Sequence, residues 1–142
     1  MQAVKRQGKR ERYTVAYPGH HFKPRDILTF IEMKGFGDDW QDLKLTDDDL
    51  AAVQIAIMAA PRMNELIRGT GGLRKLRYVT RGASGRRKAI RVCYAYFQEY
   101  EMVLLVVAYA KNEQDNIRAS DRRFYREMIR RQKLALSRGP RH

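Results

Sequence analysis

The sequence has few of the residues that build disulfide frameworks, metal centres or membrane spans. Among its 142 residues there is one cysteine, Cys93, which excludes an internal disulfide and a multi-cysteine zinc site. Of the three histidines, His20 and His21 are adjacent and lack the spacing of metal ligands, so we expect no metal. The longest apolar run, Met102 to Ala110, has about half the length that a membrane helix needs. We therefore expect a soluble, cytoplasmic protein with no membrane partner.

Acidic residues are also scarce, and the surplus of basic residues is unevenly spread. The chain has 29 Lys and Arg against 16 Asp and Glu, a net charge of +13, which makes a polyanion such as nucleic acid the default partner. Residues 26–60 hold two basic and eight acidic side chains, whereas residues 61–91 hold ten basic and one acidic. We interpret the central block as a polyanion-binding surface, and a merely solvated face is the alternative.

The chain divides into one domain and two tails. Residues 1–25 are basic and lack a sustained apolar period, so we expect a flexible extension there. We place the domain at residues 26–136 and a short tail at residues 137–142.

Apolar spacing within the domain predicts the order β-α-α-β-β-β-α. Strands are predicted from β-prone or alternating runs at residues 27–33, 73–79, 88–97 and 102–110. Helices are predicted at residues 36–43, from a capping Thr46 to Pro61, and from a capping Ser120 with the buried stripe Phe124, Met128 and Ile129. This predicts an α+β fold: a curved, mainly antiparallel sheet of about four strands with the helices on one face. The last strand is apolar on both faces, which favours a central place in the sheet.

Strand alternation predicts that basic side chains gather on one side of the sheet. Residues two apart on a strand point the same way, so Lys75 and Arg77 share a side, as do Tyr109 and Lys111. Arg91 points away from the core-facing residues of its strand. Together these five residues are expected to form a concave cationic patch that binds phosphate and offers a tyrosine for stacking of a base.

Three segments carry a resemblance to a known family. Residues 69–77 read Gly-Thr-Gly-Gly-Leu-Arg-Lys-Leu-Arg, residues 89–97 read Ala-Ile-Arg-Val-Cys-Tyr-Ala-Tyr-Phe, and an apolar strand from Leu104 runs into Tyr-Ala-Lys-Asn-Glu at residues 109–113. In this order and spacing they resemble the RelE/HigB family, the toxins of bacterial type II toxin–antitoxin systems, and in particular its HigB-like branch. The resemblance covers residues 26–135.

The resemblance implies an endoribonuclease with a RelE-like microbial RNase fold. Such toxins are mRNA interferases that act in the ribosomal A site, beside 16S rRNA, and are neutralised by a cognate antitoxin that often has a helix-turn-helix. They need no metal or other cofactor, and they cleave RNA by attack of a ribose 2′-hydroxyl on the adjacent phosphate. Basic side chains suit this reaction because they neutralise the charge that builds on the phosphate in the transition state.

Carried over by position, the resemblance implies a catalytic set of Lys75, Arg77, Arg91 and Lys111. Lys75 is the candidate for proton transfer, and Arg77 and Arg91 are the candidates for binding the scissile phosphate. Further RNA-binding residues are expected at Arg74, Arg86, Arg87, Lys88 and Tyr109.

The acid–base assignment stays open in the sequence. Asn112 and Arg118 stand where better-studied RelE toxins have an arginine and a catalytic tyrosine. Tyr109 and Tyr125 are the candidate substitutes. Cys93 has apolar strand neighbours and no nearby histidine, so we expect a small, half-buried residue there and no nucleophile.

Three other functions remain open. A ParE-like toxin shares the fold but poisons DNA gyrase, a non-catalytic RNA- or ribosome-binding module uses the cations only to hold phosphate, and an inactive copy keeps the fold alone. The cation-rich strand at residues 73–79 favours the ribonuclease. RNA cleavage products separate the ribonuclease from the others, since salt-dependent binding is common to every RNA-binding function.

Overall fold

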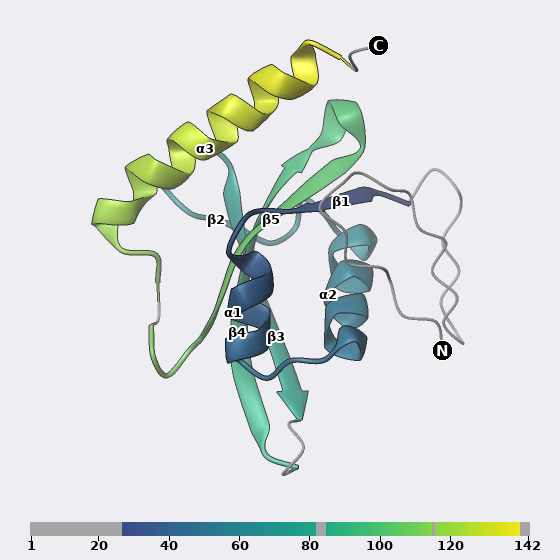
Figure 1. Ribbon diagram of the computed structural model, residues 1–142, viewed down its shortest axis with the longest axis vertical. Coiled ribbons are helices and arrows are strands. Elements are labelled where there is room, and N and C mark those ends of the chain that lie inside the picture. The colour runs from purple at the N-terminus through teal and green to yellow at the C-terminus, as the bar shows by residue number, and fades with distance from the viewer. Residues whose placement is uncertain (1–26, 82–84, 115, 140–142) are drawn as a thin grey trace.

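The computed structural model describes residues 27–81, 85–114 and 116–139 (Figure 1). The predicted extension at residues 1–25 lies outside the described residues. The elements follow in the order β1 (Thr29–Glu32), α1 (Phe36–Asp42), α2 (Asp47–Ala59), β2 (Glu65–Leu66), β3 (Leu73–Arg81), β4 (Arg87–Phe97), the 3-10 turn η2 (Gln98–Tyr100), β5 (Met102–Ala110) and α3 (Ala119–Ser137). The α+β class and the order of the long elements are confirmed. The two-residue β2 is an addition, too short to leave an alternating pattern.

The strands form one sheet in the order β1-β5-β4-β3-β2. Strands β3, β4 and β5 pair antiparallel as a meander, β2 pairs antiparallel with β3, and β1 runs parallel to β5. The sheet is thus mainly antiparallel, as predicted. β4 holds the central place that the sequence predicts for β5, and β5 lies beside it with a partner on each edge.

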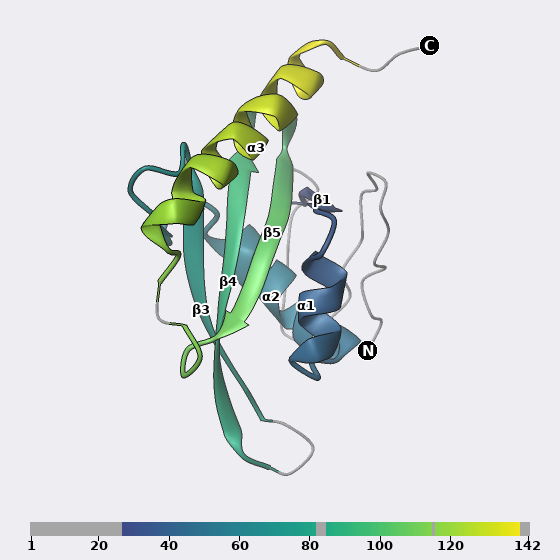
Figure 2. The ribbon, with the colours of Figure 1, turned by 60° about the vertical axis from the view of Figure 1, so that its left-hand side comes forward.

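Helices cover both faces of the sheet, which corrects the expectation that all of them pack on one face (Figure 2). α1 and α2 pack on the face that carries Val92 and Tyr94, and α3 packs on the face that carries Cys93 and Ala95. The reason lies in β5, where almost every side chain is buried. A strand that is apolar on both sides requires cover on both sides.

An irregularity in β5 decides which way its side chains point. The pairing of β4 with β5 shifts by one residue, which leaves Val106 as an extra residue of β5. Before this bulge Leu105 packs on the α1–α2 side, and after it Tyr109 packs on the α3 side. Two odd-numbered residues of a regular strand would point the same way. Tyr109 therefore reaches its side of the sheet because of the bulge.

The start of α2 is fixed by a capping box at Thr46, the residue that the sequence predicts as the cap. Thr46 Oγ1 accepts a hydrogen bond from the Asp49 N–H (3.1 Å), and Asp49 Oδ2 accepts one from the Thr46 N–H (2.9 Å). Asp49 Oδ1 accepts hydrogen bonds from Tyr78 and Thr80 of β3. Burial opposes the charge of Asp49, but the hydrogen bonds from Thr46, Thr80 and Tyr78 outweigh it and lower the pKa of the carboxyl. The cap thus also ties α2 to the sheet.

The start and the buried stripe of α3 differ from the prediction. Arg118 is the N-cap residue and Ser120 lies within the first turn, so no side chain caps this helix. Ile129 is buried and Met128 is partly buried against the same core, as predicted, whereas Phe124 is 63% exposed. Leu136, two turns after Ile129, is buried in its place, so the helix docks through a narrow stripe. Neither α3 nor any other described helix is long and apolar enough to span a membrane.

We predict that Asp49→Ala lowers the free energy of unfolding by about 2 kcal/mol, because it removes a helix cap and leaves two hydroxyls of β3 without their acceptor. Urea denaturation at neutral pH measures the loss. A lowered folded-state pKa stabilises the protein only while the carboxyl is ionised. The difference from wild type should therefore shrink as the pH falls below the ordinary value of 3.8 and through the lowered pKa.

The matched control is Asp48→Ala, which removes an exposed carboxylate from the same first turn of α2. It should lower the free energy of unfolding by less than about 1 kcal/mol, since it weakens only the interaction with the helix dipole. An equal loss in both variants, or a loss in Asp49→Ala that does not depend on pH, would contradict the role of Asp49.

Candidate functional site

The strand register brings predicted site residues together on the α3 side of the sheet. Arg77 of β3 lies opposite Arg91 of β4, and Arg91 lies opposite Tyr109 of β5. Lys75 lies opposite Cys93, which packs in the core beneath α3. We call Lys75, Arg77 and Arg91 the cationic face. Arg77, Arg91 and Tyr109 come from three adjacent strands, and the alternation of side chains along each strand turns all three to the same side.

The buried cations of this face have few partners. Lys75 is 5% and Arg91 is 7% exposed. Lys75 Nζ donates a hydrogen bond to Asn116 Oδ1 (2.7 Å) and lies 3.8 Å from Glu65 Oε2. Arg91 Nη1 donates a long hydrogen bond to the Ile90 carbonyl (3.5 Å), and no carboxylate in the described part of the chain pairs with it. A buried charge is costly without partners, so the guanidinium of Arg91 is suited to an incoming anion.

Cys93 and Tyr109 form the floor of the site beneath α3. Burial raises the pKa of the Cys93 thiol to about 12, although a hydrogen bond with Tyr109 and the charge of Lys75 act in the opposite direction. The thiol is fully buried, deeper than the half-buried position that the sequence predicts, and it stays protonated at neutral pH. The ring of Tyr109 is 7% exposed, so a base can stack on it only if the residues that cover it move.

Tyr125 approaches the same floor from α3. Its ring is half-buried and packs against the core that includes Cys93 and Tyr109. Burial raises the pKa of Tyr125, and the negative charge of Asp121 raises it further. The phenol is therefore protonated at neutral pH and suited to donate a proton rather than to accept one.

Arg74 lies on the opposite side of β3 from the cationic face. Its Nη1 donates to the carbonyls of Arg62 and Asn64, at 2.8 Å each. Through these bonds Arg74 holds the segment before β2 in place. The RNA contact that the sequence predicts for Arg74 would have to use its remaining donors.

The other predicted cations gather where β4 begins, at the turn end of the β3–β4 hairpin. Arg86 is exposed, and Lys88 Nζ donates to the Leu43 carbonyl (3.0 Å). Lys111 lies with Arg87, Lys88, Ala89 and Asn112 around a cavity of about 340 Å³. The structure thus places Lys111 in this second basic cluster, apart from the hydrogen bonds and ion pairs of Lys75 and Arg77.

Two residues that contact the cationic face were not predicted from the sequence. Glu65 of β2 pairs with Lys75 and Arg77, and its signal was available, because it is the single acidic residue of the block at 61–91. Asn116 binds Lys75 from a loop that lies 41 residues later in the chain. No pattern in the sequence links residues so far apart.

The Gly-rich segment before β3 brings α3 close to the site. Gly71 has a φ of +72°, and a Cβ at this position would lie 3.1 Å from Cγ of Arg126. Gly69 approaches Arg122 in the same way. The small, left-handed residues therefore let α3 set two arginines beside the start of β3.

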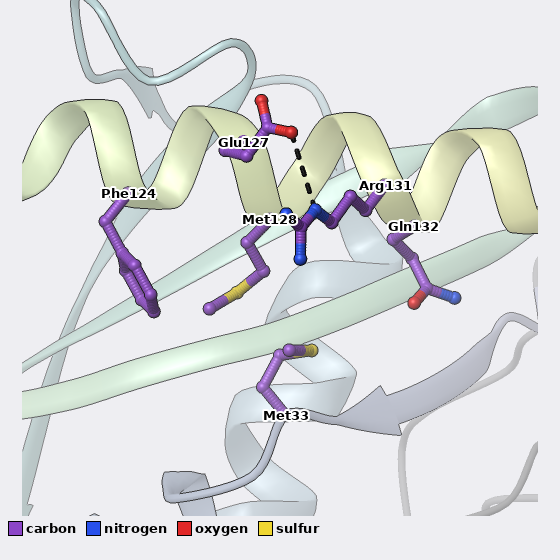
Figure 3. Close-up of a pocket in the computed structure, with 6 residues that line it drawn as sticks. All are labelled: Met33, Phe124, Glu127, Met128, Arg131 and Gln132. Carbon is purple, nitrogen blue, oxygen red and sulfur yellow. Dashed lines mark hydrogen bonds and ion pairs between the residues drawn. The ribbon is translucent and has the colours of Figure 1, made fainter.

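An apolar groove lies on the other flank of α3 (Figure 3). It has a volume of about 400 Å³ and is lined by Met33, Phe124, Glu127, Met128, Arg131 and Gln132. Its one carboxylate, Glu127, is already paired with Arg130 and Arg131. Residues two apart on a helix point in nearly opposite directions, so this groove and the Gly-rich segment flank α3 on different sides. The groove offers no charged group free for acid–base work.

No group of three His, Cys, Asp or Glu side chains able to hold a metal ion occurs among residues 27–81, 85–114 and 116–139. The charged groups of the site are thus mainly cations.

Comparison with solved structures gives a likeness in fold. No protein-family model matches the chain. The structure is similar to that of a double arginine-to-alanine mutant of the Escherichia coli toxin RelE in the free state, with a TM-score of 0.44 and 16% sequence identity. The match covers 61% of this chain and 85% of the RelE chain.

We predict that Cys93 of the folded protein reacts with iodoacetamide at least about 100-fold more slowly than in the unfolded chain at pH 8, because its thiol is buried and its pKa is raised to about 12. Mass spectrometry of quenched time points measures the rate, and the same protein in urea is the control. Rapid alkylation of the folded protein would contradict the buried position of the thiol.

Proposed function

We propose that the protein is the toxin component of a type II toxin–antitoxin system, a ribosome-dependent mRNA interferase of the HigB-like branch. The observation that carries this proposal is the alignment of Lys75, Arg77 and Arg91 across β3 and β4. A cluster of cations whose one carboxylate partner among the described residues is Glu65 is suited to a phosphodiester. The segments at residues 69–77, 89–97 and 104–113, which resemble RelE/HigB toxins, contain all three residues of the cationic face.

The proposed reaction is cleavage of the RNA backbone by its own ribose. The 2′-oxygen forms a bond to the adjacent phosphorus, and the bond from phosphorus to the 5′-oxygen breaks. The 2′-hydroxyl gives its proton to a base and the leaving 5′-oxygen takes one from an acid, which leaves a 2′,3′-cyclic phosphate end. Addition of a water molecule opens this ring to a 3′-phosphate. Negative charge grows on the phosphate oxygens meanwhile, and fixed cations lower the barrier by neutralising it.

The side chains of the cationic face divide these tasks. Arg91 has donors left for the phosphate oxygens, and the half-exposed guanidinium of Arg77 lies beside it on the neighbouring strand. Lys75 is held by Asn116 and donates from a buried position, so it is our candidate for proton transfer to the 5′-oxygen. Tyr125, protonated and near the same floor, is the alternative donor.

The proposed partners follow from the same surface. mRNA would lie across the cationic face within the A site. The second basic cluster of Arg86, Arg87, Lys88 and Lys111 would contact 16S rRNA, where phosphate contacts position a protein without reading sequence. A cognate antitoxin, with a helix-turn-helix in our proposal, would neutralise the toxin by covering part of the cationic face or by holding its side chains apart.

We predict that Lys75→Ala and Arg91→Ala each lower cleavage of a defined mRNA by about 100-fold or more in a reconstituted translation system, because each removes a charge that stabilises the transition state. Primer extension measures the cuts, with and without ribosomes. The wild type should cut at codon boundaries only when ribosomes are present.

The controls are Lys34→Ala and Arg138→Ala, which each remove one exposed positive charge away from the cationic face. Both should cleave like the wild type. Intact mRNA with functional ribosomes would overturn the proposal and leave gyrase poisoning, a non-catalytic binding module or an inactive copy, of which a supercoiling assay detects the first. Equal losses in the controls would show a general effect of charge.

A further inference from the structure

Glu65 bridges two cations of the proposed active site. Its Oε1 lies 3.0 Å from Nη2 of Arg77, and its Oε2 lies 3.8 Å from Nζ of Lys75. In the pairing of the two-residue strand β2 with β3, Glu65 lies directly opposite Lys75. It is the single acidic residue among residues 61–91. The most basic block of the chain thus places its one carboxylate on the cationic face.

The backbone that presents Glu65 is anchored from the opposite side of the sheet. Arg74 donates to the carbonyls of Arg62 and Asn64, just before Glu65. Asn64 Nδ2 donates to the hydroxyl of the buried Tyr94 (2.9 Å), and that hydroxyl donates to the Pro61 carbonyl (2.9 Å). Position 65 is therefore held in place by bonds that do not involve its own side chain.

The ion pair between the Glu65 carboxylate and Arg77 is exposed to solvent. Its side chain is 52% exposed, and that of Arg77 is 57% exposed. An ion pair in such a position contributes little net stability, because water solvates both groups well when they separate. A guanidinium binds carboxylate and phosphate through the same donors, so the two anions compete for Arg77.

We infer that Glu65 is the internal counter-ion of the cationic face, which orients Arg77 and Lys75 in the free protein and yields Arg77 to the RNA phosphate. The inference rests on the proposed function, since it takes the phosphate to be that of RNA. Glu65 is a positioning residue here. Its carboxylate weakens the binding of any phosphate, and it keeps the two cations in the place where the scissile phosphate needs them.

The test compares Glu65→Gln with Glu99→Gln, which removes an equal charge from an exposed carboxylate in η2. Inorganic phosphate is titrated into each 15N-labelled protein, and the amide shifts of β3 and β4 report binding. Glu65→Gln should bind phosphate about 5-fold more tightly than the wild type, the scale of an exposed ion pair. Glu99→Gln should match the wild type, and Glu65→Asp should restore wild-type affinity at least in part.

Cleavage on the ribosome supplies a second readout. Glu65→Gln should lower both KM and kcat, because phosphate binds without a competitor while Arg77 and Lys75 lose their alignment. A residue needed only for folding would not strengthen binding.

The outcomes of the phosphate titration decide the inference separately from the proposed function. Unchanged phosphate affinity in Glu65→Gln, or an equal change in Glu99→Gln, overturns the inference even if RNA is cleaved. The expected gain in affinity, seen in a protein that cuts no RNA, supports the counter-ion role and overturns the ribonuclease instead.

Discussion

The antiparallel register of β3, β4 and β5 is the constraint on which the site depends. Side chains alternate along a strand, so a slip of one residue would move Lys75 and Arg77 into the core against α1 and α2. The neighbours Leu76, Ile90 and Val92 are packed in that core and resist such a slip. The positions of the cations are thus fixed less by their own contacts than by the apolar residues between them.

Burial of these cations fixes their positions but lowers the stability of the fold. Lys75 and Arg91 are buried, and the partners of Lys75 among the described residues are the neutral amide of Asn116 and the carboxylate of Glu65 at 3.8 Å. Sites that bind charged ligands commonly retain such unfavourable burial, and the rest of the fold compensates for it. Here two apolar cores, one on each side of the sheet, are the source of stability available for this. An anion that bound the site would offset part of the free energy that burial of the two cations costs.

The sequence predicts the long elements of this fold well and its contacts between distant segments poorly. Alternation and capping residues are local, so the strands from Leu73 onward and the start of α2 at Thr46 were predicted correctly. The bulge at Val106 and the side of the sheet that α3 covers depend on tertiary packing, which no local pattern records. Ser120 is a good capping residue by type, yet the N-cap of the helix is Arg118, two residues earlier. Within the site, strand parity predicts the shared side of Lys75, Arg77 and Arg91, while Asn116 reaches Lys75 through a loop.

The parallel pair at the edge of the sheet favours one order of assembly. Thr29 lies opposite Met102, so the first strand of the described chain pairs with the last. The meander from Leu73 to Ala110 needs only short loops to close, and such local contacts form early in folding. β1 precedes the meander in the chain, but its partner residues, Met102–Leu105, lie in the last strand of the meander. The cationic face, built entirely within that one stretch, can therefore be complete while the sheet still lacks its first strand.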